Sequence, residues 1–320
     1  MKRVEYLDTL RGLAIFFMIM QHAFLVHEIG AGDSNNIISV IFVALGTWPA
    51  APVFMVVLGI FLMQSKRPNK VLMFRGLKLL ALGYLLNFVR FTIPLLIAKD
   101  SKAFELLFEI DILQLAGLSF IILAGLRKIA SNKFLFPTIM ILIAFVSPYL
   151  WNDFNYLTDP FIGSSELVSF PVFPWIIYPM LGMYLSNTLL SLNKQRIIKL
   201  LLASFTLAII GVLTIGQHTI FDYPQHTFDL HFLITAFVIV YFLIIYWLTK
   251  RFGYPKILSL WSEYITQIYI LQWIIFGYSI LFLNANQFGP IEAMIIGLIV
   301  VIVVHLLVTK TKISRFIPKV

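Results

Sequence analysis

Two charged side chains and one titratable histidine lie in one apolar stretch near the start of the chain. Residues 7–22 read LDTLRGLAIFFMIMQH and contain Asp8, Arg11 and His22. Arg11 and His22 are eleven residues apart. On a helix that spacing is about 1100°, so the two side chains share a face to within roughly 20° and lie about 16 Å apart along the axis. Such groups inside a bilayer-spanning helix are costly and usually functional.

Each of the three residues has a chemical and a structural interpretation. A histidine can take a proton from a hydroxyl or an amine near neutral pH, or can itself receive a transferred group. Arg11 can bind a phosphate, and Asp8 lies one turn earlier, where it can orient Arg11. The structural alternative is an interfacial ion pair between Asp8 and Arg11 and a hydrogen bond from His22 to another helix.

The composition predicts an all-α membrane protein. Of the 320 residues 60% are apolar and 12% are charged, whereas soluble domains are about a quarter charged. Long apolar runs recur along the whole chain, which favours a helical bundle and excludes the alternating pattern of a β-barrel. We interpret the first run as a retained helix, not a cleaved signal peptide. The absence of cysteine excludes disulfides, a cysteine nucleophile and thiolate-bound metals.

We expect about ten transmembrane helices in one domain, residues 1–320, because no linker or low-complexity tract divides the chain. A short apolar piece at 37–45 precedes the second span and is expected to be an interfacial or re-entrant helix. Kinks are expected at the prolines inside several spans, which are Pro52, Pro94, Pro137, Pro171 and Pro174. The expected spans are about 5–26, 47–64, 72–97, 104–126, 133–150, 168–190, 196–215, 229–249, 257–283 and 290–309.

The basic residues give these spans a direction. All but three of the 24 lysines and arginines fall on one side of the membrane, the exceptions being Arg90, Lys99 and Lys102. This asymmetry predicts cytoplasmic amino and carboxyl termini in a multi-pass inner (plasma) membrane protein. The net charge of +9 is thus explained by basic residues in short loops on one side of the membrane, without a nucleic-acid partner. The expected partners of the chain's surface are membrane lipids. Polar residues remain inside the expected spans: Asn87, Arg90, Asp111, Gln114, Gln267 and Gln272.

At this point the sequence resembles the transmembrane acyltransferases, which include the acyltransferase-3 group and the bacterial relatives of heparan-α-glucosaminide N-acetyltransferase. The first helix, with arginine and histidine separated by ten residues, is similar to the opening of that superfamily. Four further stretches agree in order: AAPVFMVVLG (50–59), DILQLAGL (111–118), FPVFPWIIYPMLGMYLS (170–186) and SEYITQIYILQW (262–273). One position departs from the pattern, because Gln272 stands where many relatives have histidine.

The resemblance implies transfer of an acyl group, commonly acetyl, from cytoplasmic acyl-CoA to an extracytoplasmic glycan or amino sugar. His22 is then the central catalytic residue, assisted by Asp8, and direct transfer and a route through acyl-His22 both remain open. We expect the CoA phosphates to be bound by Arg11, Arg75 and Lys78. Candidates for acceptor binding are the intramembrane polar groups and one aromatic side chain that can stack on a sugar: Asp111, Gln114, Gln272 and Trp175.

Other classes of protein compete with this interpretation. A transporter or flippase would also have kinked helices and intramembrane charges, but it does not need the arginine–histidine pattern of the first helix. An accessory membrane protein is disfavoured by the many polar groups inside the spans. No metal is expected, because Pro224 interrupts the histidine- and aspartate-containing segment 218–231. A homodimer stays open as an alternative to a monomer.

Overall fold

Helices make up the regular structure of the described residues. The computed structural model describes residues 4–31, 36–151, 156–163, 165, 167–215, 227–283 and 285–311, in which no strand occurs. Within these described ranges, six helices are long and apolar enough to cross a membrane. They confirm the all-α membrane class, and they are Glu5–His27, Ile37–Gln64, Asn69–Ile97, Lys194–Thr214, Phe228–Phe252 and Pro290–Lys310.

The four remaining expected spans correspond to shorter or interrupted helices. Two are the short apolar helices α6 (Ile112–Leu126) and α7 (Leu135–Leu150). The span expected at 168–190 is divided into α9 (Val172–Trp175) and α10 (Ile177–Leu189), with non-helical dihedral angles at Phe173 between Pro171 and Pro174. The span expected at 257–283 is divided at Tyr264 into α13 (Lys256–Glu263) and α14 (Ile265–Ser279). The count of ten spans therefore stays a prediction.

The short helix expected at 37–45 is present, and its interfacial or re-entrant position stays a prediction. That segment, α2 (Ile37–Leu45), continues through a π-helical turn, η1 (Gly46–Ala50), into α3 (Ala51–Gln64), and the three form one helical run. A second π turn, η2 (Phe88–Thr92), joins α4 (Asn69–Asn87) to α5 (Ile93–Ile97). Proline lacks an N–H and clashes with the carbonyl four residues earlier, and a widened turn relieves that clash. The π turn η1 contains Pro49 and precedes Pro52, and η2 precedes Pro94, so the irregularities expected near Pro52 and Pro94 are π turns just before them.

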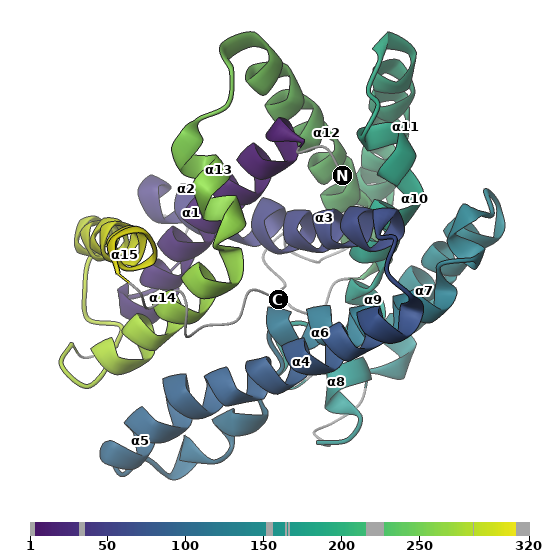
Figure 1. Ribbon diagram of the computed structural model, residues 1–320. Coiled ribbons are helices and arrows are strands. Elements are labelled where there is room, and N and C mark those ends of the chain that lie inside the picture. Colours follow the sequence, from purple (N-terminus) through teal and green to yellow (C-terminus); the bar gives the residue numbers. More distant parts are fainter. Residues whose placement is uncertain are drawn as a thin grey trace. The chain divides into compact units, whose positions relative to one another are not determined.

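The chain forms two compact units, and each is described by itself. The first contains residues 1–51, 86–107 and 244–320. In it α1 (Glu5–His27) packs against α2, α13, α14 and α15 (Pro290–Lys310) (Figure 1). The second contains residues 52–85 and 108–243, with α6, α7, the short α8 (Asp159–Ile162), α9, α10, α11 (Lys194–Thr214) and most of α12 (Phe228–Phe252). The units alternate along the sequence, so a single domain over 1–320 remains a prediction.

Helix α1 is the central helix of the first unit. It is apolar on nearly every side, and Leu7, Leu10, Ala14 and Phe24 are fully buried. A Cβ at Gly12 would lie 2.4 Å from the carbonyl oxygen of Leu258, so only glycine lets α13 approach this closely. Small residues at such contacts are how membrane helices pack tightly. The first helix is therefore held firmly along its length, and so are the side chains that it presents.

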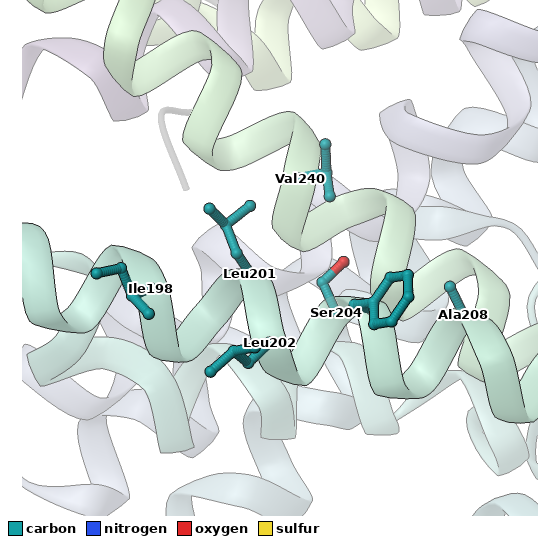
Figure 2. A pocket seen from close by; sticks show the side chains of 7 residues that line it. Ile198, Leu201, Leu202, Ser204, Ala208 and Val240 are labelled. Atoms are coloured by element: carbon teal, nitrogen blue, oxygen red, sulfur yellow. The ribbon is translucent and has the colours of Figure 1, made fainter.

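The second unit has an apolar groove along α11 and α12 (Figure 2). The groove has a volume of 510 Å³, and Leu201, Leu202 and Phe205 are among its lining residues. Its single polar lining residue, Ser204, donates a hydrogen bond of 2.9 Å to the carbonyl oxygen of Ala236. Because no titratable side chain is among its lining residues in the described part of the chain, the groove offers no means of acid–base chemistry.

Candidate active site around His22

His22 lies near the end of α1 and is held by two consecutive residues of α14. It is half-buried, and its Nδ1 atom is 3.1 Å from the carboxamide nitrogen of Gln272. Its ring lies against the indole of Trp273, with ring centroids 4.2 Å apart and planes inclined by 36°. The predicted residues His22 and Gln272, 250 positions apart in sequence, are thus brought into direct contact.

A buried arginine packs against the indole that contacts His22. Arg90, in η2, is 0% exposed, and its guanidinium carbon is 4.3 Å from the Trp273 ring centroid and 4.4 Å from that of Phe91. Its Nη2 atom donates a 3.0 Å hydrogen bond to Asn87, whose amide nitrogen donates to the carbonyl oxygen of Leu107 at 3.1 Å. Cation–π contacts contribute about 2 kcal/mol when desolvated. Arg90 therefore restrains the indole that contacts His22.

Replacement of Arg90 by methionine is expected to lower the catalytic rate by about 10–100-fold, because loosening a positioned group by about 1 Å has an effect of that size. Lysine should restore only part of the activity, since an ammonium is a compact charge and cannot stack flat on two rings. Rates measured on purified protein, together with thermal unfolding, check this. The matched control is Arg251→Met at the exposed end of α12. Equal rates for Arg90→Met and Arg251→Met would contradict the assigned role.

Asp8 and Arg11 lie at the opposite end of α1 from His22. The Asp8 carboxylate accepts a 2.8 Å hydrogen bond from Ser262 of α13, and Arg11 is half-buried. Asp8 precedes His22 by 14 residues, or about 21 Å of helix, so it does not contact the imidazole. Its predicted part in the reaction therefore concerns the Arg11 end of the helix. The roles of both residues stay predictions.

Arg75 and Lys78, the other predicted phosphate ligands, lie on α4 in the second unit. The guanidinium of Arg75 is half-buried and lies 5.4 Å from the ring centroid of Phe120. Lys78 is exposed, and its ammonium lies 5.0 Å from the Phe74 ring on the same helix. Of the two, Arg75 has the more enclosed surroundings.

Asp111 and Gln114 form the start of α6. The Asp111 carboxylate accepts from the backbone N–H of Ile112 at 2.6 Å, and the Gln114 side chain accepts from the N–H of Asp111 and donates to the carbonyl of Glu109. The Asp111 side chain also accepts from the backbone N–H of Gln114, and this reciprocal pair is a capping box, which satisfies backbone donors that a helix start leaves over. It explains both residues structurally, and acceptor binding by them is a prediction that the contacts do not favour.

Trp175 is fully buried. Its ring centroid is 4.8 Å from that of Phe170 and 5.3 Å from that of Tyr178. The Tyr178 hydroxyl in turn lies 2.9 Å from Nδ1 of the buried His231. Stacking of a sugar on Trp175 would first require its uncovering, so packing within the second unit accounts for this residue better than the expected sugar contact.

Two residues of the His22 cluster were not predicted as site residues. Trp273 follows Gln272 directly, and Arg90 was noted only as a polar residue inside a span. The available signal was that Arg90 is one of three basic residues on the side opposite to all others. Among the described residues no group of three or more His, Asp or Glu side chains could hold a metal ion, and most of segment 218–231 lies outside them.

Fold and site together define a polytopic membrane protein with a histidine-centred polar cluster on its first spanning helix, an arrangement suited to group transfer. A family model described as heparan-alpha-glucosaminide N-acetyltransferase, catalytic, matches residues 3–228. The chain belongs to this family, since the match covers more than half of it, and it is a membrane acetyltransferase. This confirms the resemblance recognised in the sequence. A search among curated proteins finds no significant match.

Proposed function

We propose that the protein transfers an acetyl group from cytoplasmic acetyl-CoA to the amine of a glucosamine-containing acceptor on the other side of the membrane, with His22 as the reacting side chain. The observation that supports this most is the cluster of His22, Gln272 and Trp273 on two packed helices in a chain of the acetyltransferase family. Transport without covalent chemistry, the earlier alternative, has no comparable observation in its favour.

In direct transfer the acceptor amine attacks the carbonyl carbon of the thioester and His22 takes the proton that the amine loses. The new C–N bond forms, the C–S bond breaks, and CoA leaves as a thiol after receiving the proton from His22. In the two-step alternative the His22 imidazole attacks first and releases CoA, and the acceptor then takes the acetyl group from acyl-His22. Release of CoA in the absence of an acceptor would distinguish the second route.

The proposed orientation, with ten spans and cytoplasmic termini in the plasma membrane, is supported by contacts within each unit. In the second unit Arg127, after α6, donates to the carbonyl of Arg67 at 3.0 Å, so two basic loops expected in the cytoplasm lie together. In the first unit the start of α1 contacts α13 through Asp8 and Ser262, whereas its end contacts Ser279 through His27. Arg11 would then face the compartment that contains CoA, and His22 the acceptor side.

Simultaneous charge reversal of Arg11, Arg75 and Lys78 is expected to raise the KM for acetyl-CoA by about tenfold or more for each of them that binds phosphate, because each charge-assisted hydrogen bond to phosphate contributes about 1.5–3 kcal/mol. The rate at saturating acetyl-CoA should change much less. The control reverses two exposed basic residues of α11, Lys194 and Lys199, and should leave KM within about twofold. An unchanged KM in the triple variant would remove these residues from the donor site.

The function itself is tested by incubating purified protein with isotope-labelled acetyl-CoA and glucosamine and analysing the products by mass spectrometry. We expect N-acetylglucosamine and CoA in equal amounts. Unmodified glucosamine, with uptake of acceptor into vesicles that contain the protein, would favour a transporter instead. Comparing cell-envelope glycans of strains with and without the protein then identifies the natural acceptor and shows whether oxygen or nitrogen is acetylated.

A further inference from the structure

The contact between Gln272 and His22 can be made in two ways. Gln272 is 0% exposed. The atom placed as its carboxamide nitrogen lies 3.1 Å from Nδ1 of His22. The nitrogen and oxygen of a carboxamide have the same shape, so the heavy-atom positions fit both orientations. Either the amide N–H donates to a bare Nδ1, or an Nδ1–H donates to the amide oxygen.

The two orientations give His22 different chemistry. If Gln272 donates to Nδ1, the neutral imidazole carries its proton on Nε2, which can then neither accept a proton nor attack a carbonyl carbon. If Gln272 accepts from Nδ1–H, the lone pair lies on Nε2, which points away from Gln272. The hydrogen bond at one ring nitrogen sets the state of the other. Both routes of the proposed function need the second arrangement.

We propose that Gln272 is a positioning residue that presents its carboxamide oxygen to the Nδ1–H of His22 and so keeps Nε2 unprotonated for acetyl transfer. The inference rests on the proposed function. Trp273 supports it, because its indole lies 4.2 Å from the imidazole and restrains the ring from rotating out of the hydrogen bond. Gln272 thus orients the histidine as a carboxylate does in other histidine-dependent enzymes, but without adding a charge to the membrane interior.

This orientation also provides donors for the substrate. One polar atom of the Gln272 carboxamide and the indole nitrogen of Trp273 are buried and lack a hydrogen-bond partner among the described residues. A buried donor without an acceptor costs about 1–3 kcal/mol, and groups that remain so in a folded protein call for an explanation. With the carboxamide oxygen on His22, both atoms are N–H donors next to the imidazole. The acyl carbonyl oxygen, on which negative charge develops, is the ligand atom that such donors suit.

The test compares Gln272→Glu with Gln272→Met. Glutamate keeps the length and can accept from Nδ1–H, so its rate should stay within about tenfold of the wild type. Methionine has similar length but no acceptor, and should lower kcat by about a hundredfold or more with little change in KM, since a wrong tautomer has a large effect. A purely steric role predicts the opposite order, because methionine fills the site without burying a carboxylate. Wild-type kcat in Gln272→Met would overturn the proposal.

Nitrogen NMR of histidine-labelled wild-type protein gives a readout that packing alone would not change. We expect the Nδ1–H form for the His22 signal, which is assigned by its loss in His22→Gln. Finding the Nε2–H form in active wild-type protein overturns the assignment to Gln272, even if the Gln272 variants fail to fold. The two failures are distinguishable: activity in His22→Gln contradicts the proposed function, whereas an inactive His22→Gln with an Nε2–H wild type contradicts only the role of Gln272.

Discussion

Replacement of His22 by glutamine is expected to reduce acetyl transfer by about a hundredfold to ten-thousandfold. Glutamine is polar and uncharged and can still hydrogen-bond to Gln272, so the packing of α1 on α14 is preserved. It can neither take a proton from the acceptor amine nor form an acyl intermediate, and general-base catalysis accounts for about 10²–10⁴ in rate. The rate is measured with labelled acetyl-CoA on protein shown to be folded by its elution volume and unfolding temperature.

The matched control is a second membrane-embedded histidine that the account does not use. His305 of α15 accepts a 3.1 Å hydrogen bond from the indole N–H of Trp261, and it lies on a different helix from His22. His305→Gln should therefore keep the transfer rate within about threefold, with at most a modest loss of stability of about 1 kcal/mol from the altered hydrogen bond. A His22→Gln protein as active as His305→Gln would show that His22 is only a helix-packing residue.

Substitution of Gly277 by alanine adds one methyl group. We expect this addition to lower stability and activity more than the same addition at any other glycine of the first unit. A Cβ at this position would lie 2.0 Å from the carbonyl oxygen of Arg90 and 2.9 Å from its carbonyl carbon. Both atoms belong to the backbone, so η2 and α14 must move apart, at a cost of about 1–3 kcal/mol or more. Arg90 and Trp273 lie on those two elements, and a shift of about 1 Å there should lower the rate by about a hundredfold.

Gly125→Ala provides the comparison, because nothing lies within 4 Å of the added methyl group in α6. Alanine is the better helix former by about 1 kcal/mol, so this variant should be as active as the wild type and slightly more stable. The unfolding temperatures of the two variants should thus change in opposite directions. If Gly277→Ala unfolds and reacts like Gly125→Ala, then η2 and α14 do not depend on this contact for their positions.

The sequence pattern was sufficient for the membrane class, because long apolar runs have one stable solution in lipid. Interruptions of the helices were harder to predict. Tyr264, where α13 ends and α14 begins, is neither proline nor glycine and gives no local signal. The start of α6 did have a signal, since aspartate followed three residues later by glutamine is a capping pattern, but its apolar surroundings favoured an earlier start.

Within the candidate site, residues on one helix were predictable and contacts between helices were not. The spacing of Arg11 and His22 along α1 follows from helix geometry alone. The meeting of His22 with Gln272 and Trp273 depends on how α1 packs on α14, and the place of Arg90 depends on the π turn before Pro94. Asp111, Gln114 and Trp175 looked like ligand contacts because polar and aromatic side chains inside spans are rare. In the structure these residues make capping and aromatic contacts, and acceptor binding by them stays a prediction.

The most direct test uses protein reconstituted into sealed vesicles that enclose glucosamine, with acetyl-CoA added only outside. The account predicts N-acetylglucosamine inside the vesicles, formed at the rate at which CoA appears outside, and almost none with His22→Gln. Transfer across the membrane would be contradicted if acetylated product formed only outside the vesicles, from glucosamine that had leaked out. The role of His22 in that transfer would be contradicted if wild type and His22→Gln formed equal amounts of enclosed product.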